Sequence, residues 1–213
     1  MQTLDSLITE MFVSGSSIAL ADYLETEKHP AASEIRFLEN PLQVLRRLAQ
    51  HLSKPAVIFS LPISQQEQLE VALLHTRLDD SLLFTIACDF ANHVLPVFEA
   101  WNENDKRLEN LIETMRDWIN HNCKDDQLRE ARYELTNYSS RRKISKMPAG
   151  PKDVVSTVLT ATDPWAWAKH CAAAFSAHET SVKAQKIAGP TEIDWQIEHA
   201  TQMFLKNGNS NGP

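Results

Sequence analysis

Residues 87–118 read ACDFANHVLPVFEAWNENDKRLENLIETMRDW and hold two apolar patterns on either side of a polar turn. Each pattern places apolar side chains three or four residues apart, which is the period of an α-helix that buries one face. With the flanking residues, the apolar positions are Leu83, Ile86, Ala87, Phe90, Ala91, Val94 and Phe98, then Leu108, Leu111, Ile112, Met115 and Ile119. The stretch therefore predicts an antiparallel pair of helices joined at residues 102–105, with a kink or an early end at Pro96.

The same helical period recurs through most of the chain, and only five of its 213 residues are glycine. Both features favour an all-α protein. We expect a helical N-terminal part over residues 1–77, a helical bundle over residues 78–207 and a disordered tail over residues 208–213. Residues 56–61, AVIFSL, are too short and apolar to assign, and fit either a buried strand or a connector.

Capping residues predict where several helices begin. Ser64 followed by Glu67 matches a capping box. Asp153 is expected to cap a helix that contains VVSTVLTA. Asp163-Pro164 is expected to begin the next helix, because proline fits the first helical turn.

Composition narrows the class of protein. The formal net charge of −7 argues against a nucleic-acid-binding protein, which should carry a concentrated positive stripe. The N-terminus has no positive n-region and no 18 apolar residues run together, so neither a secretion signal nor a membrane span is expected. Cys88, Cys123 and Cys171 show no paired spacing, so we expect reduced thiols and a cytoplasmic location.

Candidate chemical groups are few. Asp89 and His93 lie four residues apart, which fits a surface or interface pair better than a carboxylate orienting a catalytic imidazole. The histidine and cysteine clusters at residues 121–123 and 170–178 lack the spacing of metal ligands, so no metal site is expected. Cys88 is expected to be a small buried apolar group. No glycine-rich phosphate or dinucleotide motif is present, and we expect no cofactor.

The second half of the stretch carries a set of charged residues, namely Arg107, Glu109, Glu113 and Arg116. If they are exposed, each pair contributes about 0.2–0.5 kcal/mol. If they face the first helix, they form a polar network that fixes how the two helices pack, at a desolvation cost. We expect the structural role first and a binding surface second, with Trp118 closing the apolar seam.

The stretch also resembles the Imm5-like immunity family, which is found beside bacterial polymorphic toxins. The family carries a pattern close to A-C-D-x-A-x-x-V-L-P-x-F-E, matched here by Ala87, Cys88, Asp89, Ala91, Val94, Leu95, Pro96, Phe98 and Glu99. A second pattern, D-x-R-x-x-x-x-I-E-x-x-R-x-W, is matched by Asp105, Arg107, Ile112, Glu113, Arg116 and Trp118. WAKHCAAAFSA resembles a family helix at His170, and IDWQIEH resembles the final helix at Trp195 and Gln196.

The likeness extends over residues 80–205, but YELTNYSSRRKISKMPAGP departs from the alanine-rich middle of the family. It implies a non-catalytic, cytoplasmic helical bundle that binds a cognate toxin and neutralises it. An alternative is a helical scaffold that self-associates through Trp101, Trp165 and Trp167. A less favoured alternative is an enzyme that uses Asp89, His93 and His170.

Overall fold

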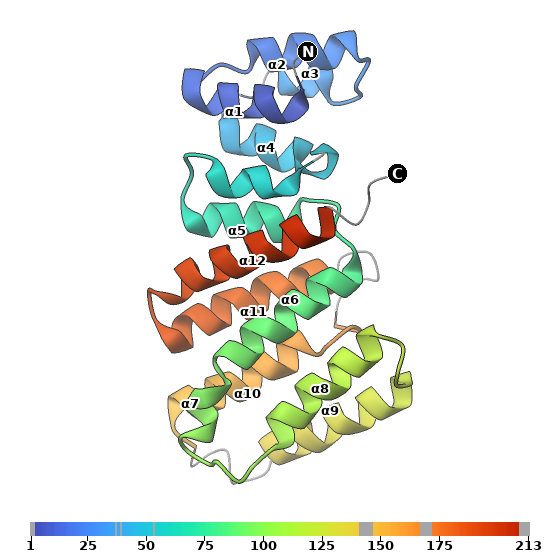
Figure 1. Ribbon diagram of the computed structural model, residues 1–213, viewed down its shortest axis with the longest axis vertical. Coiled ribbons are helices and arrows are strands. Elements are labelled where there is room, and N and C mark those ends of the chain that lie inside the picture. The colour runs from blue at the N-terminus through green and yellow to red at the C-terminus, as the bar shows by residue number, and fades with distance from the viewer. Residues whose placement is uncertain are drawn as a thin grey trace. The chain divides into compact units, whose positions relative to one another are not determined.

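The protein is all α-helical in its computed structural model, which describes residues 3–36, 38, 40–52, 54–140, 147–166 and 172–208 (Figure 1). No strand occurs within these ranges. The chain forms two compact units, one of Met1–Arg77 with Ile197–Pro213, and one of Leu78–Gln196. The predicted bundle reached residue 207, whereas the structure assigns the residues after Gln196 to the first unit. Residues 209–213, most of the predicted disordered tail, lie outside the described ranges.

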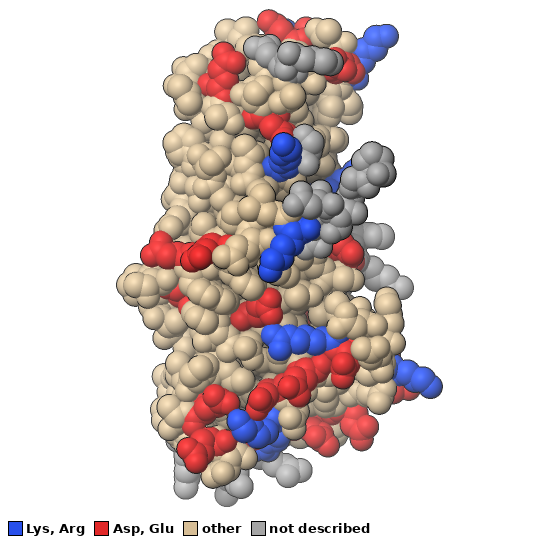
Figure 2. Space-filling model, in the orientation of Figure 1, with Lys and Arg blue, Asp and Glu red and all other residues tan. Residues whose placement is uncertain are grey.

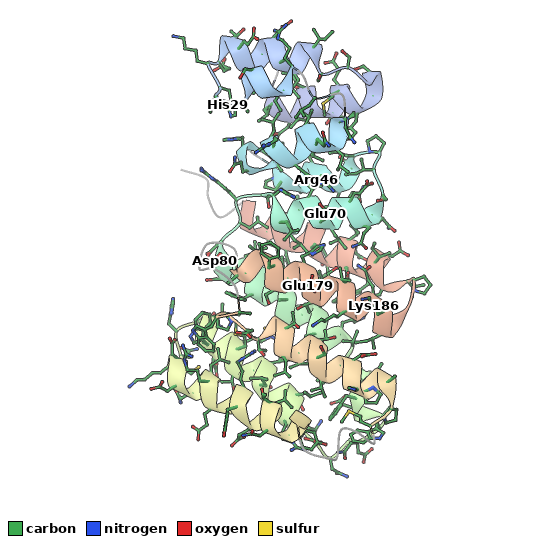
Figure 3. All side chains as sticks on the ribbon, turned by 180° about the vertical axis from the view of Figure 1, so that it is seen from behind. His29, Arg46, Glu70, Asp80, Glu179 and Lys186 are labelled. Carbon is green, nitrogen blue, oxygen red and sulfur yellow. The ribbon has the colours of Figure 1, made fainter. Side chains whose placement is uncertain are left out.

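The first unit is built from short helices. They are α1 (Leu4–Ser14), α2 (Ile18–Thr26), α3 (Ala32–Ile35), α4 (Pro41–Leu48), η1 (Ala49–His51), η2 (Pro55–Ser60), α5 (Gln65–Leu74) and the later part of α12 (Glu192–Gly208). The predicted capping box forms at α5, where Ser64 and Glu67 each accept a hydrogen bond from the backbone of the other. Arg46 of α4 pairs with Glu70 of α5 at 2.8 Å (Figure 3). The segment AVIFSL is not a strand, because it lies mostly in the 3-10 helix η2, which connects α4 and η1 to α5 and buries Ile58.

The second unit surrounds one central helix. Its elements are α6 (Asp80–His93), α7 (Leu95–Glu99), α8 (Arg107–Ile119), α9 (Asp125–Ser140), α10 (Ala149–Ala161), α11 (Ala172–Ala188) and the start of α12. Helix α6 packs against α11, α8 and α10 (Figure 1). Small buried residues on the facing helix, among them Ala173 and Ala177, allow α6 and α11 to approach closely. Along α6, Ile86 and Phe90 are fully buried.

Pro96 separates two helices within the first half of residues 87–118, as predicted from its missing backbone N–H group. Helix α6 ends at His93, and Pro96 lies in the first turn of α7. Asp80–Glu99 is the one segment of the described ranges with the length and apolar composition of a membrane span. A soluble core helix passes the same test, and 56% of the apolar window is buried inside the protein.

Two predicted helix starts are wrong. Helix α10 begins at Ala149, so Asp153 lies inside it rather than at its cap. After α10, Asp163 accepts a hydrogen bond from the backbone of Trp165 at 3.1 Å, and residues 164–166 form a turn and bend. The carboxylate of Asp163 also binds Arg132 of α9 at 2.6 Å, which draws it toward a different helix. The described part of helix α11 is Ala172–Ala188.

Candidate functional site

The first half of the family pattern is tied to the second half by an ion pair. Arg116 Nη2 on α8 donates to Asp89 Oδ1 on α6 at 2.9 Å. Beside them, Cys88 is fully buried, and burial raises the pKa of its thiol to about 12. Trp118 packs edge-on against Phe84 of α6 at a ring distance of 5.9 Å. These residues hold α8 on α6, and the Cys88 thiol has no nucleophilic character at neutral pH.

His93 is held by the last helix of the second unit. Its Nδ1 lies 2.8 Å from Glu192 Oε2, and its ring stacks on Trp195 with centroids 3.6 Å apart. The Glu192 side chain is 1% exposed, whereas that of His93 is 39% exposed. Gln196 Nε2 donates to the other carboxylate oxygen of Glu192 at 3.1 Å. His93 and Trp195, the latter in the segment that resembles the family's final helix, therefore form one polar and aromatic contact between α6 and α12.

The turn between α7 and α8 is fixed by a second group of family residues. Asp105 accepts two hydrogen bonds from the guanidinium of Arg107, and its side chain is 6% exposed. These bonds lower the pKa of the Asp105 carboxyl. The same guanidinium lies 3.4 Å from the centre of the Tyr138 ring on α9. Lys106 Nζ binds Glu99 at 3.2 Å, so α7, α8 and α9 meet at this turn.

Four arginines of α8 and α9 have partners inside the second unit. Arg107 and Arg116 bind the two aspartates described above, and Arg129 lies 4.0 Å from the centre of the Trp165 ring. Arg132 is 16% exposed and donates to the carbonyl of Leu159 at 2.7 Å as well as to Asp163. Three of the four arginines are therefore paired with an aspartate, and the fourth, Arg129, is exposed beside an aromatic ring.

The carboxylates of the same helices are left on the surface. Five of them are exposed and have no ion-pair partner in the described part of the chain, namely Glu113, Asp117, Asp126, Glu130 and Glu134. We call these five residues the acidic face. Figure 2 shows Asp and Glu side chains gathered over α8 and α9. Tyr133, on α9 between Glu130 and Glu134, is 68% exposed.

The structure separates the charged set predicted for α8. Arg107 and Arg116 take part in packing, as the structural reading requires, whereas Glu113 is exposed. Glu109 is half-buried and pairs with Lys106 at 3.1 Å. The set is therefore divided between residues that make packing contacts and a residue that faces solvent.

Of the three residues named for the catalytic alternative, Asp89 and His93 lie in the described ranges. Asp89 binds Arg116 while His93 binds Glu192, and His170 lies outside the described residues. Cys171 and Trp167 also lie outside them. No group of His, Cys, Asp or Glu in those ranges is arranged to hold a metal ion. Trp101 is 39% exposed and packs on Phe98, and Trp165 is half-buried.

Sequence reasoning missed Tyr138 and Glu192. Tyr138 lies 31 residues beyond its partner Arg107, and Glu192 lies 99 residues beyond His93. A helical period relates side chains up to about four residues apart, so it carries no signal for these pairs. The one available hint was an acidic residue, Glu192, at the start of a helix, where carboxylates are common for another reason.

Comparison with known proteins agrees with the resemblance. The family model described as "Imm-5 like putative immunity protein" matches residues 74–148, the range that contains α6, α7, α8 and α9. The predicted resemblance is thus confirmed for this range, while His170 and Trp195 lie beyond it. No curated protein and no solved structure matches the chain.

Proposed function

We propose that this chain is a cytoplasmic, non-catalytic immunity protein that binds a toxin protein and neutralises it. The family match supports an immunity role in general. The observation that carries the proposal further is the acidic face, which lies within the matched range. Its carboxylates are exposed and have no ion-pair partner among the described residues, whereas Arg116 and Arg132 of the same helices bind aspartates of neighbouring segments, so the surface offers negative charge to a partner.

The acidic face suits a toxin with a basic surface. An enzyme that cuts nucleic acid must itself attract phosphates, so it presents lysine and arginine side chains. Complementary charge between two proteins accelerates their association and disfavours partners of the wrong charge. A carboxylate surface would also compete with the nucleic acid for the same basic groups.

Tyr133 supplies the aromatic anchor of this surface. Charged residues are depleted from the centres of protein interfaces, whereas tyrosine is enriched there and often carries much of the binding energy. Tyr133 has both the exposure and the position that this role requires, since Glu130 and Glu134 flank it on α9. In the proposed complex the ring is buried and the carboxylates surround it.

The test is co-expression with the toxin domain encoded by the neighbouring gene. We expect the full chain to restore growth and to co-purify with the toxin. The variant Tyr133→Ala should weaken the complex by at least about tenfold, because hot-spot truncations typically cost 2 kcal/mol or more. No rescue and no complex would overturn the proposal.

A charge-reversal pair locates the interface. Glu113→Lys with Glu130→Lys should slow association and reduce its dependence on salt. Glu10→Lys with Glu27→Lys is the matched control, since both residues are exposed on the first unit. Equal losses for the two double variants would show that net charge, rather than the acidic face, governs binding.

The scaffold alternative makes a different prediction. Self-association would use exposed aromatic side chains such as Trp101. Light scattering distinguishes the two functions, because an immunity protein that acts as proposed requires no self-association. A stable oligomer disrupted by Trp101→Ala would favour the scaffold.

A further inference from the structure

A groove of about 450 Å³ in the second unit is lined by none of the residues of the quoted family patterns. Three helices each line it with two polar side chains four residues apart, so that both side chains of a pair face the same way. The pairs are Arg132 and Thr136 on α9, Lys152 and Ser156 on α10, and Glu179 and Lys183 on α11. Val155 and Leu159 of α10 add an apolar part to the wall.

The groove carries a small net positive charge in a protein whose net charge is negative, since Glu179 offsets only one of Lys152 and Lys183. Arg132 is paired with Asp163, so these two cancel. Lys183 Nζ binds two neutral hydroxyl groups, Thr160 Oγ1 at 2.6 Å and Ser156 Oγ at 3.3 Å. Neither Lys183 nor Lys152 has a carboxylate within ion-pair distance in the part of the chain that the structure describes.

The Lys183 ammonium is positioned by two hydroxyl groups and keeps a donor for an anion. A lysine ammonium has three N–H donors, and two of those of Lys183 are occupied by hydroxyl oxygens. The third is available, and hydrogen bonds from an ammonium to an anionic oxygen are stronger than those to a neutral acceptor. Lys152, one turn before Ser156 on α10, brings a second ammonium to the same groove.

We propose that this groove binds a small amphiphilic anion. A carboxylate or phosphate group would lie between Lys152 and Lys183, and its apolar part would lie against Val155 and Leu159. The volume falls in the range of small-molecule sites, about 300–1,000 Å³. Glu179 also lines the groove, and its carboxylate repels a bound anion. The proposal is independent of toxin binding, since none of these residues belongs to the acidic face.

The experiment titrates the full chain with phenyl phosphate, benzoate and benzylammonium, followed by ¹H–¹⁵N NMR. We expect the two anions to shift groove resonances below about 10 mM, the affinity range of fragment-sized ligands. The better of the two identifies the preferred anionic group. The cation should not bind there. Absence of groove shifts with both anions would overturn the proposal.

Matched variants separate a built site from general surface charge. Lys183→Met and Lys152→Met should each weaken anion binding by about tenfold, the loss of one charge-assisted contact. Lys186→Met is the control, because Lys186 is exposed two turns beyond Glu179 on the same helix (Figure 3). Glu179→Gln should strengthen binding. A loss as large for Lys186→Met as for Lys183→Met would refute the site, and Lys152→Met serves should Lys183→Met unfold.

Discussion

Removal of the His93 side chain tests the contact that holds α12 to α6. In His93→Ala, the carboxylate of Glu192 loses its hydrogen-bond donor at 2.8 Å but stays buried, with Gln196 still donating to it. Trp195 loses the ring stacked on it at 3.6 Å. Two effects therefore lower the free energy of unfolding. The buried carboxylate of Glu192 is left with fewer hydrogen-bond donors, and one face of the Trp195 ring loses its stacking partner.

The magnitude follows from these two losses. A hydrogen bond to a charged group contributes about 1.5–3 kcal/mol, and an aromatic stack about 0.5–1.5 kcal/mol. The His93 side chain is 39% exposed, so water replaces part of what is lost. We expect the free energy of unfolding to fall by about 2 kcal/mol. Glu192→Gln in the same background should recover about 1 kcal/mol, since a buried amide tolerates the missing partner better than a carboxylate.

Urea unfolding followed by tryptophan fluorescence measures this change. All five tryptophans lie between residues 101 and 195, so their fluorescence reports on the second unit alone. Asn92→Ala is the control, because Asn92 is the exposed neighbour of His93 on α6 and should change stability by less than about 0.5 kcal/mol. Equal stabilities for His93→Ala and Asn92→Ala, or additive effects of the two substitutions at His93 and Glu192, would refute the reasoning.

Three further predictions concern other positions of the second unit. Gly150→Ala should stabilise α10 by about 0.5 kcal/mol, because alanine favours a helix more than glycine does. The new Cβ would meet a methyl group of Val97 at 3.3 Å, and this side chain is partly exposed and can shift. A fall in the thermal midpoint would contradict this. Cys88 should resist iodoacetamide at pH 8 in the native protein and react once urea is added, as checked by peptide mass spectrometry; native labelling would show that its pKa is not raised. The lowered pKa of Asp105 means that its contribution to stability is present above the ordinary carboxyl pKa and is lost as pH falls through the lower folded value. Acid unfolding of Asp105→Asn should therefore show a shallower loss than that of the native chain, and identical profiles would exclude the linkage.

The sequence predicted the elements of the central pair because their cause is local. The spacing of apolar residues in α6 and α8 selects a helix and its buried face. Pro96 cannot continue α6, because its nitrogen has no hydrogen to donate and its ring clashes with the preceding turn. The start of a helix was harder to predict where a candidate capping residue also binds a side chain of another helix. Asp163 accepts a cap-type hydrogen bond from the backbone of Trp165 and binds Arg132 through its other oxygen, yet residues 164–166 form a turn and bend instead of a helix.

The sequence alone determined that the chain is helical, where its central helices lie and which family its middle resembles. Only the tertiary structure decided what each polar side chain does. His93 lies four residues from Asp89, yet its partner is Glu192, and Arg116 takes Asp89 instead. The acidic face has both origins, since the sequences of α8 and α9 already contain seven carboxylates against four arginines, and packing decides which of these side chains stay exposed. Packing pairs Arg116 and Arg132 with partly buried aspartates and leaves five carboxylates in water, because burying a charge without a partner is costly.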